Sequence, residues 1–419
     1  MNNELWKLSG FFALSATKTV LLNRSKLVEW IHERNIKHAW LAQSVNVSEK
    51  TLTRWLNGDV KRVRHSNLKK LADVLDCELS ELVAVSEAEQ YPSEKNRDIL
   101  VNELYNDSLL YELIMSSKVR LAISLIKSTF HSMLPSAITA SFYTKLGYAA
   151  LIHRKQKTAK KYFDKAALKA ESTDHSEVLF SVNLAFAIMY FIDCEYAKCY
   201  LYLQRCESDI EHAGQELAHY YNTLALYYLY KAEFDRSIAF SELCIEACSP
   251  DSPSIEKALF LCTAHQLKGA AYLCLGNFER GLMACEDSLI IAKRSGYPRC
   301  IRLAQAYLGA ALACNGKIPQ ALVFIEQCLN GADKDDVSMP TLVCAAMFVN
   351  YKAKNVEALR LLHDDLAMLC PSQSAPVQFG RVLMMRAKCF DQTEYIQAQQ
   401  DVAACLSAME LTMWKRFLV

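Results

Sequence analysis

Glycine and proline are scarce in this chain of 419 residues, which contains twelve glycines and nine prolines. All-β sandwiches and barrels need a turn about every ten residues, and they draw on these two residue types for those turns. The scarcity therefore disfavours an all-β fold and favours long helices. The chain is too long for one small core, and its 52% hydrophobic and 22% charged residues predict a globular protein of two or three domains.

Several sequence motifs for metal binding, nucleotide binding and catalysis are also missing. No Cys-x-x-Cys pair occurs among the sixteen cysteines, so a zinc site built on closely spaced ligands is not expected. The sequence has no Walker loop, Gly-x-Gly-x-x-Gly, His-Glu-x-x-His or Gly-x-Ser-x-Gly motif. His363, Asp364 and Asp365 form an acidic trio that we interpret as a solvated helix face. We therefore predict no catalytic residue, no metal site, no cofactor and no enzyme activity.

The cysteines lie in apolar stretches such as 196–206 and 258–285. This placement favours reduced, buried thiols in a cytoplasmic protein over disulfides. The longest apolar stretch, Val178–Ile192, is interrupted by Ser181 and Asn183 and is shorter than the ~20 residues of a membrane span. The sequence thus predicts a soluble protein with no membrane partner.

Charge is distributed unevenly, although the net charge is only +1. Residues 23–72 contain eleven lysines and arginines against four acidic residues, a net +7, so the remainder of the chain has a net −6. A small basic module on a mildly acidic body is typical of a nucleic-acid binder, because the charge of the module attracts phosphates.

Five short helices are predicted between residues 23 and 85. In the first helix Leu27, Trp30 and Ile31 share one face, and the helix ends near Asn35. The others are expected over 37–44, 49–56, 66–75 and 79–83. Ser48 is a good N-cap for the third helix, and Asn57-Gly58 is a C-cap signal. Leu52 and Trp55 are expected on the buried side of that helix.

The stretch from Leu27 to Leu82 resembles the lambda-repressor-like (Xre) helix-turn-helix family. The match rests on Ala42, Val47, Ser48, Leu52, Trp55-Leu56-Asn57-Gly58 and Leu68-x-x-Leu71-Ala72-x-x-Leu75. His38 stands where this family commonly has Gln, and Asn46 stands where it usually has Gly. Asn is the next most tolerant residue for a left-handed conformation. The resemblance implies that the third helix enters the major groove of DNA.

By this resemblance Lys50, Thr51 and Arg54 are predicted to meet base edges, since Arg pairs bidentately with guanine and a Thr methyl can contact thymine. Ser48, His38 and the basic run that begins at Lys61 are predicted to contact phosphates, which position a protein without reading sequence. The full predicted DNA-binding set is His38, Ser48, Lys50, Thr51, Thr53, Arg54, Lys61, Arg62 and Arg64. The alternative is a helix-turn-helix that serves protein contacts only.

From about residue 99 a small residue recurs at intervals of 37 to 44 residues. These positions are Gly147, Ala187, Ala225, Gly269, Gly309 and Ala346, and another small residue follows each by twelve positions, at Ala159, Cys199, Ser237, Gly281, Ala321 and Ala358. Turn signals lie between them, most clearly Gly276-Asn277-Phe278 and Asn315-Gly316-Lys317. Small residues at this spacing favour helical hairpins, because one hairpin buries its apolar face only by packing closely on the next.

The pattern resembles the tetratricopeptide repeat over about 99–410, with seven or eight hairpins. We therefore predict an all-α fold in which an N-terminal arm (1–22) precedes a five-helix helix-turn-helix domain (23–85). A polar linker (86–98) leads to an α-solenoid of tetratricopeptide-like hairpins (99–419). Its last segment, Leu411–Val419, is expected to cap the solenoid or join a dimer interface.

A solenoid of this kind has a concave groove lined by the first helix of each hairpin. The residues predicted to line it are Asn183, Phe191, His219, Asn222, Tyr230, Gln266, Asn350 and Tyr351. Side-chain amides suit an extended peptide, because they can bond both the N–H and the C=O groups of its backbone. The alternative for each residue is an ordinary buried polar group that bonds neighbouring helices.

A helix-turn-helix followed by such repeats resembles the RRNPP family, the peptide-pheromone receptors of Gram-positive bacteria and their phages. The resemblance implies a sequence-specific, homodimeric transcription regulator in quorum sensing, with an operator in double-stranded DNA and a short signalling peptide as partners. Two alternatives stay open. One is a constitutive phage- or immunity-type repressor whose repeats only dimerise or recruit another protein, and the other is a repeat adaptor or chaperone that binds no DNA.

Overall fold

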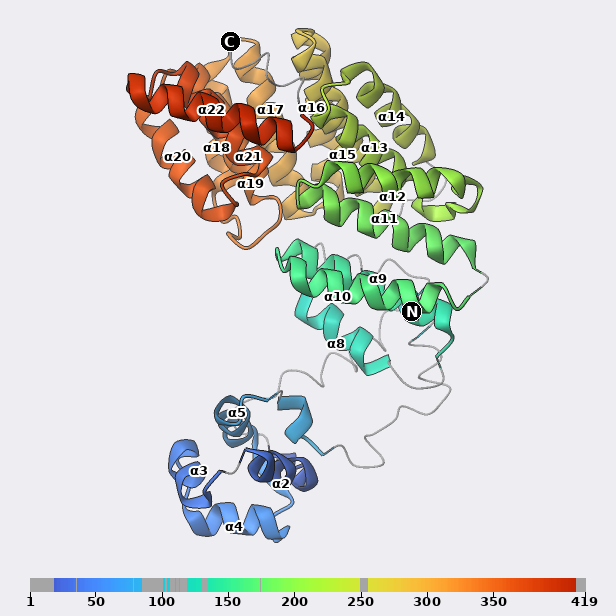
Figure 1. Cartoon of the computed structure of the whole chain (residues 1–419), viewed down its shortest axis with the longest axis vertical. Helices are drawn as coiled ribbons and strands as arrows, with labels where there is room; N and C mark the ends of the chain where they lie inside the picture. Colours follow the sequence, from blue (N-terminus) through green and yellow to red (C-terminus); the bar gives the residue numbers. More distant parts are fainter. Residues whose placement is uncertain are drawn as a thin grey trace. The chain divides into compact units, whose positions relative to one another are not determined.

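The computed structural model of the chain describes residues 19–84 without 35 and 78, short pieces between 101 and 129, and 134–411 without 174 and 249–254. It divides into two units, Met1–Ile99 and Leu100–Val419, here called the helix-turn-helix unit and the repeat unit (Figure 1). Apart from one small sheet in the first unit, every regular element of the described residues is a helix. The predicted all-α fold is thus confirmed. Most of the predicted arm, the linker and residues 412–419 lie outside the described residues.

The helix-turn-helix unit contains the predicted helices close to their predicted positions. They are α2 (Arg24–Glu33), α3 (His38–Val45), α4 (Glu49–Asn57), α5 (His65–Val74) and η1 (Leu79–Leu82). The fifth, η1, is one turn of 3-10 helix. Asn46 ends α3 with a φ of 60° and a ψ of 50°, so it adopts the left-handed conformation expected at the usual glycine position.

A two-stranded sheet was not expected from the sequence. Strand β1 (Thr19–Leu21) pairs antiparallel with β2 (Arg62–Arg64), with Val20 opposite Val63. Leu22 then bridges to Val83, and its side chain is 6% exposed. The chain therefore joins the core of the unit four residues before the predicted start at 23. Strands of three residues are too short to show a period of two in the sequence.

Among the described residues of the repeat unit, helix α8 (Val119–Thr129) is followed by seven helical hairpins. The hairpins are α9 (Ser136–Ile152) with α10 (Gln156–Ala170), α11 (Ser176–Ile192) with α12 (Tyr196–Ser208), α13 (Leu217–Tyr230) with α14 (Phe234–Ala247), α15 (Ile255–Cys274) with α16 (Phe278–Ser295), α17 (Pro298–Cys314) with α18 (Ile318–Leu329), α19 (Met339–Lys352) with α20 (Val356–Leu369), and α21 (Ala375–Arg386) with α22 (Gln392–Ala408). Two 3-10 turns, η2 (Ile210–His212) and η3 (Gly214–Glu216), precede α13.

The recurring small residues lie where the two helices of a hairpin touch. At Gly147 a Cβ atom would come within 2.1 Å of the buried Phe163 ring of α10. In the third hairpin the hydroxyl of Ser237, which is fully buried, donates to the Ala225 carbonyl at 2.8 Å. The paired spacing of twelve residues therefore marks the contact between the two helices of each hairpin.

Later segments of the repeat unit contact its earlier hairpins. The Val337 N–H, in the loop before α19, donates to the Ile152 carbonyl at the end of α9 at 2.9 Å. Met409 and Leu411, which follow α22, belong to one hydrophobic cluster with Tyr227 of α13, and the Lys231 ammonium donates to the Glu410 carbonyl at 2.8 Å. Figure 1 shows the red α22 turning back toward the green hairpins. The last hairpin is thus held against earlier ones.

All sixteen cysteines are described and none forms a disulfide, as predicted; nine are buried and Cys274 is exposed. Within the described ranges, no helix is both long and apolar enough to cross a membrane. The same residues hold no cluster of three His, Cys, Asp or Glu side chains that fits a metal ion.

Candidate functional site

Helix α4 presents the predicted DNA-reading face at the surface. The Ser48 hydroxyl oxygen accepts a hydrogen bond from the Thr51 N–H at 3.1 Å, which caps the start of the helix, and Gly58 ends it with a φ of 82°. Leu52 and Trp55 are 1% and 3% exposed and face the core. These contacts fix the helix so that Lys50, Thr53 and Arg54 are exposed and Thr51 is half-buried.

The basic residues of the unit fall into two groups. The Arg24 guanidinium donates to the Leu56 carbonyl, and the Arg34 guanidinium donates to the Leu75 carbonyl and lies 4.5 Å above the Trp30 ring. Lys50 and Arg54, by contrast, make no hydrogen bond or ion pair with any described residue. The fold thus uses the first pair of arginines internally and leaves the cations of α4 open to a partner.

The hydroxyl groups of α4 are already bonded within the helix. The Ser48 and Thr51 hydroxyls lie 2.8 Å apart, and the Thr53 hydroxyl donates to the Glu49 carbonyl at 2.8 Å. The methyl groups of both threonines therefore remain as the groups most suited to a base contact. Sequence reasoning overlooked Glu49, the exposed first residue of α4. Its position at the N-terminus of the third helix was the signal, because a glutamate there can accept from cytosine N4.

The residues predicted to contact phosphate are all exposed: His38 at the start of α3, Lys61 just before β2, and Arg62 and Arg64 within β2. Arg62 is partly engaged, since its guanidinium donates to the Thr19 carbonyl at 3.1 Å and so holds β1. The side chains of Lys61 and Arg64 make no hydrogen bond or ion pair with the described residues. Substitutions of Lys61 and Arg64 therefore test a phosphate contact more directly than a substitution of Arg62, which would also remove a bond to β1.

In the repeat unit the first helices of successive hairpins pack side by side, and we call α9, α11, α13, α15, α17, α19 and α21 the first-helix layer. All eight predicted ligand residues lie in this layer, in α11, α13, α15 and α19. Two cavities, of about 650 and 630 Å³, lie elsewhere. One is on the helix-turn-helix unit beside Trp40, and the other is at the α13–α14 turn beside Phe234.

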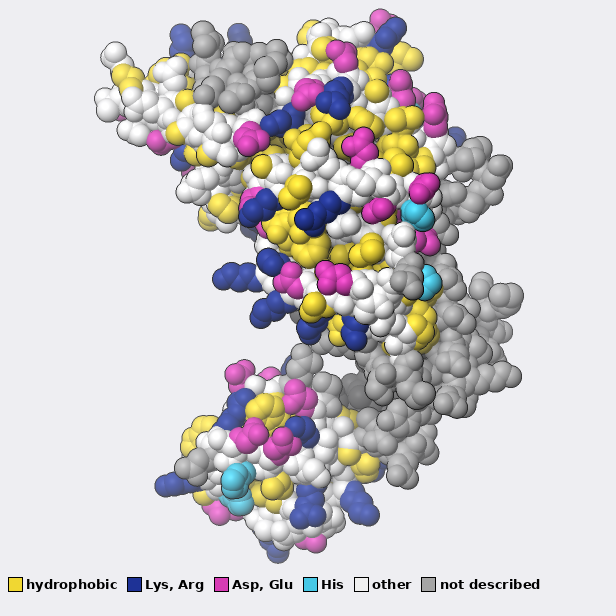
Figure 2. All heavy atoms as spheres, turned by 45° about the vertical axis from the view of Figure 1, so that its right-hand side comes forward, with side chains coloured by type: hydrophobic (Ala, Val, Ile, Leu, Met, Phe, Trp, Pro, Cys, Tyr) yellow, Lys and Arg dark blue, Asp and Glu magenta, His cyan; other side chains and the backbone are white. Residues whose placement is uncertain are grey.

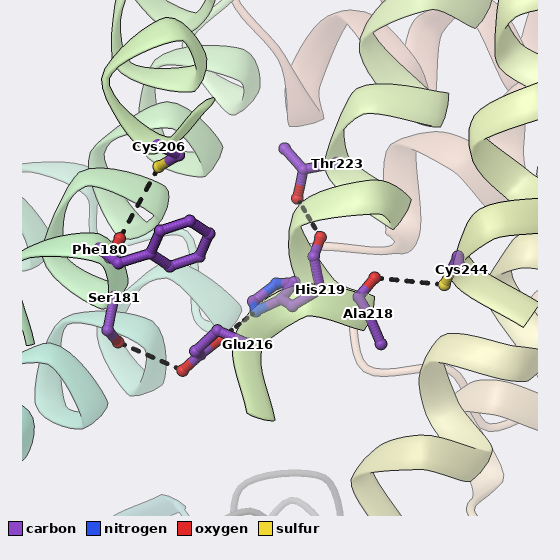
Figure 3. Close-up of polar contacts among 8 residues, drawn as sticks. All are labelled: Phe180, Ser181, Cys206, Glu216, Ala218, His219, Thr223 and Cys244. Carbon is purple, nitrogen blue, oxygen red and sulfur yellow. Dashed lines mark hydrogen bonds and ion pairs between the residues drawn. The ribbon is translucent and has the colours of Figure 1, made fainter. Parts of the chain in front are cut away.

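His219 is the centre of a polar cluster in the layer (Figure 3). Its Nδ1 lies 3.2 Å from Glu216 Oε2, and the Ser181 hydroxyl donates to Glu216 Oε1 at 3.2 Å. Burial alone would raise the pKa of Glu216, but these hydrogen bonds and the charges of His219 and Lys145 hold it below its ordinary value. The His219 ring also stacks on Phe260 of α15, with centroids 4.6 Å apart. The Tyr148 ring of α9 lies 5.7 Å from the His219 ring, so side chains from four hairpins gather around this histidine.

Asn222 lies one helical turn after His219 on α13. Its side-chain oxygen is buried and has no hydrogen-bond partner among the described residues. Phe191 and Tyr230 meet edge to face, with ring centroids 5.0 Å apart, at the other end of α13. Burial raises the pKa of Tyr230. The structure therefore brings Phe191 and Tyr230 together, and among the described residues it leaves two amide oxygens of the layer unsatisfied, that of Asn222 and that of Gln378 in α21.

The other predicted ligand residues differ in solvent exposure and in their hydrogen bonds. Gln266 is 2% exposed and its amide donates to Cys262 Sγ at 3.2 Å. Asn350 is 7% exposed and its amide donates to the Ala346 carbonyl of its own helix at 2.9 Å. Asn183 and Tyr351 are half-buried. In this conformation the amides of Gln266 and Asn350 are occupied within the protein.

The first unit and its exposed α4 face define a helix-turn-helix DNA-binding domain. Residues 26–87 match the model of the Cro/C1-type HTH DNA-binding domain. The predicted resemblance to the lambda-repressor-like family is therefore confirmed for this part of the chain. Among curated proteins, no sequence matches the chain.

The repeat unit is similar in fold to a Rap protein solved in complex with Competence and Sporulation Factor. The two share 10% identity with a TM-score of 0.56, over 78% of this chain and 96% of that one, so the similarity shows the fold. The Rap conjugation gene regulator of plasmid pLS20, in complex with the Phr* peptide, has 12% identity and a TM-score of 0.48 over 76% and 93% of the chains. The apo quorum sensor NprR from B. thuringiensis has 16% identity and the same TM-score over 78% and 97%.

Proposed function

We propose that the protein is a cytoplasmic, sequence-specific transcription regulator whose repeat unit senses a short peptide and thereby alters DNA binding. It acts as a homodimer, because helix-turn-helix proteins read two half-sites about one helical turn apart, ~34 Å. Lys50, Thr51, Arg54 and Glu49 meet base edges, while Lys61 and Arg64 are among the groups that bind phosphates. The chain itself performs no catalysis in this proposal.

The free cations of α4 support the DNA-binding half of the proposal. A guanidinium without an internal partner, at the exposed face of a rigidly capped helix, can form the bidentate pair with guanine that is the commonest specific contact. The net +7 of residues 23–72 supplies the attraction to phosphates that every operator shares. The match to the Cro/C1-type domain supports the same reading.

Asn222 is the single observation that carries the ligand half. A buried amide oxygen without a partner costs free energy, of the order of 1–3 kcal/mol, unless something donates to it. A peptide N–H is such a donor, and His219, one helical turn before Asn222, stacks on the Phe260 ring of the next hairpin. The similarity in fold to a Rap protein that was solved with a bound factor supports a ligand of this chain.

The contacts between later segments and earlier hairpins of the repeat unit favour a second candidate function, that of a constitutive regulator. Val337 bonds to Ile152, the last hairpin lies against α13, and Gln266 and Asn350 are occupied internally. A repeat unit with these contacts serves as a rigid dimerisation body. The two candidates differ in one property, because only the receptor changes its DNA affinity when a peptide is added.

The DNA half is tested with duplexes that the wild-type chain selects from a random pool. Arg54→Ala should weaken binding to the selected duplex by about 5- to 150-fold and relax preference at one base position. The matched control is Arg294→Ala, which removes an exposed arginine of the repeat unit and should leave affinity unchanged. Fluorescence anisotropy measures both. Equal affinities for the two variants would show that α4 is not the reading helix.

The ligand half is tested with the low-molecular-mass peptide fraction of the host lysate. Native mass spectrometry should detect a bound peptide on the wild type and on Asn330→Ala, an exposed control, but far less on Asn222→Ala. The captured peptide should change operator affinity by about 5- to 150-fold, and operator should change peptide affinity by the same factor, because linkage is reciprocal. A peptide that binds equally with and without operator would leave the constitutive regulator as the answer.

A further inference from the structure

We propose that helix α10 of the repeat unit is a second, sequence-independent DNA-contacting surface. Its exposed face carries four lysines spaced four residues apart, and we call Lys157, Lys161, Lys165 and Lys169 the α10 lysine row. The partner is the phosphate backbone of duplex DNA outside the bases read by α4. This inference rests on the DNA-binding half of the proposed function and adds a contact from the other unit.

The row is a continuous and open surface. Residues four apart on a helix lie on one face, so the four lysines extend over about 18 Å. Lys157, Lys161 and Lys169 make no hydrogen bond or ion pair with any described residue, and the Lys165 ammonium lies 5.6 Å from the Tyr143 ring centroid. Lys160, which pairs with Asp164 at 3.0 Å, and Lys155 extend the basic surface. Figure 2 shows dark blue side chains gathered along the lower edge of the repeat unit.

The arrangement is not explained by helix stability. Like charges four residues apart repel one another, and the row contains three such pairs in succession. Only Lys169 lies in the last turn, where a positive charge is stabilised by the helix dipole. The other side of α10, with Ala159, Phe163 and Ala166 fully buried, already holds the helix in its hairpin. A self-repelling row on a well-packed helix indicates a polyanionic partner.

The charge is specific to this hairpin. Helix α10 has five lysines against one aspartate, a net +4, and α12 has a net +1. The equivalent second helices α14, α16, α18, α20 and α22 have net charges of −2, 0, −1, −2 and −2. If these lysines served only solubility, lysines would be spread over all seven hairpins. They are concentrated in the hairpin nearest in sequence to the DNA-binding unit.

Duplex DNA fits this surface better than other polyanions or partners. The helix-turn-helix unit is on the same chain, so DNA bound there has a high effective concentration at α10. A membrane surface would need a broad apolar face beside the lysines. Leu168 is 69% exposed, but the other apolar residues of α10 are buried or half-buried in the hairpin. The helix-turn-helix unit is itself basic and would be repelled. Duplex DNA, which has one negative charge per about 1.7 Å, can neutralise both the α10 lysine row and the basic surface of the helix-turn-helix unit.

The test compares the full-length wild type with a row variant, Lys157→Ala/Lys161→Ala/Lys169→Ala. Alanine favours helix and removes the repulsion, so the variant should melt no lower than the wild type. The matched control is Lys293→Ala/Lys317→Ala/Lys334→Ala, three exposed lysines of later hairpins. Affinity for a random-sequence duplex of about six helical turns is measured at several salt concentrations. The slope of log affinity against log salt reports the phosphates neutralised.

The row variant should lower that slope by about 2–3 units, and the control should not. A fourfold rise in salt should then weaken the wild type by about 16- to 64-fold more than the row variant. Equal slopes for the wild type and the row variant would overturn the inference, as would a wild type that binds no duplex. If the row variant lost binding to phosphatidylserine vesicles but kept its binding to duplex DNA, the partner of the row would be a membrane instead of DNA. Arg54→Ala, run in parallel, loses sequence preference if the proposed function holds, whichever way the row variant behaves.

Discussion

Two pairs of charged side chains, one in each unit of the chain, are placed in opposite ways. The helix-turn-helix unit leaves Lys50 and Arg54 at the surface without a partner, whereas the repeat unit buries Arg299 and Asp336 against each other at 6% and 5% exposure. Unpaired surface cations contribute little to stability and are free to bind, while a buried pair contributes to the fold and binds nothing else. The difference teaches that function in this chain is to be sought where charge is left unpaired.

The largest expected effect comes from breaking the buried pair. Arg299 Nε donates to Asp336 Oδ2 at 2.8 Å, and the Ser338 N–H and hydroxyl donate to Oδ1 at 2.8 and 2.6 Å. Arg299→Met leaves the carboxylate buried without its counter-charge, so it should cost about 3–5 kcal/mol of unfolding free energy at pH 7. Denaturant titration measures this. A cost below about 1 kcal/mol would contradict the role assigned to the pair.

The pH dependence of that cost follows from the pKa of Asp336. Burial alone would raise this pKa, but the charge of Arg299 and the hydrogen bonds from Arg299 and Ser338 hold it below its ordinary value. In the wild type the pair therefore stabilises fully above the unfolded pKa, about 3.9, and less as pH falls through the folded pKa. In Arg299→Met no positive charge opposes the effect of burial on Asp336. Protonation of Asp336 then removes the buried charge and restores part of the stability of the variant. The difference between the two proteins should shrink from pH 7 toward about pH 4, and Arg299→Met/Asp336→Asn should lack this pH dependence.

How much of this could be predicted from sequence also differs between the units. The helix-turn-helix unit was predictable in detail, because its signals are local: Ser48 caps α4, Gly58 ends it, and Leu52 with Trp55 marks its buried side. The pairing of β1 with β2 was not, since it joins three-residue segments 43 residues apart. Which cations stay unpaired was also hidden, because the partners of Arg24 and Arg34 are carbonyls of distant segments.

The repeat unit was predictable in outline only. Its small residues mark the helix contacts, but just two of the seven hairpin turns use a glycine, Gly276 and Gly316, in the left-handed conformation. The other five turns have Arg154, Cys194, Ala232, Lys354 and Lys388 there, with φ near 60°. Such residues give no turn signal, because the packed hairpin imposes the conformation on them. The partners of the buried amides depend likewise on packing, as Gln266 with Cys262 shows.

The smallest expected effect is on the stability of the helix-turn-helix unit, and it sharpens the comparison within that unit. Lys50→Ala/Arg54→Ala removes two exposed side chains without partners, so it should change the free energy of unfolding by no more than about 0.5 kcal/mol while weakening operator binding. Arg34→Ala should do the reverse. It removes hydrogen bonds to the Leu75 and Asp76 carbonyls and the contact with Trp30, at a cost of about 1–2 kcal/mol. Urea unfolding followed by tryptophan fluorescence, beside DNA titration at one salt concentration, measures both properties. If the α4 variant were the less stable of the two, or if Arg34→Ala lost DNA affinity while folded, the division between structural and open cations would be wrong.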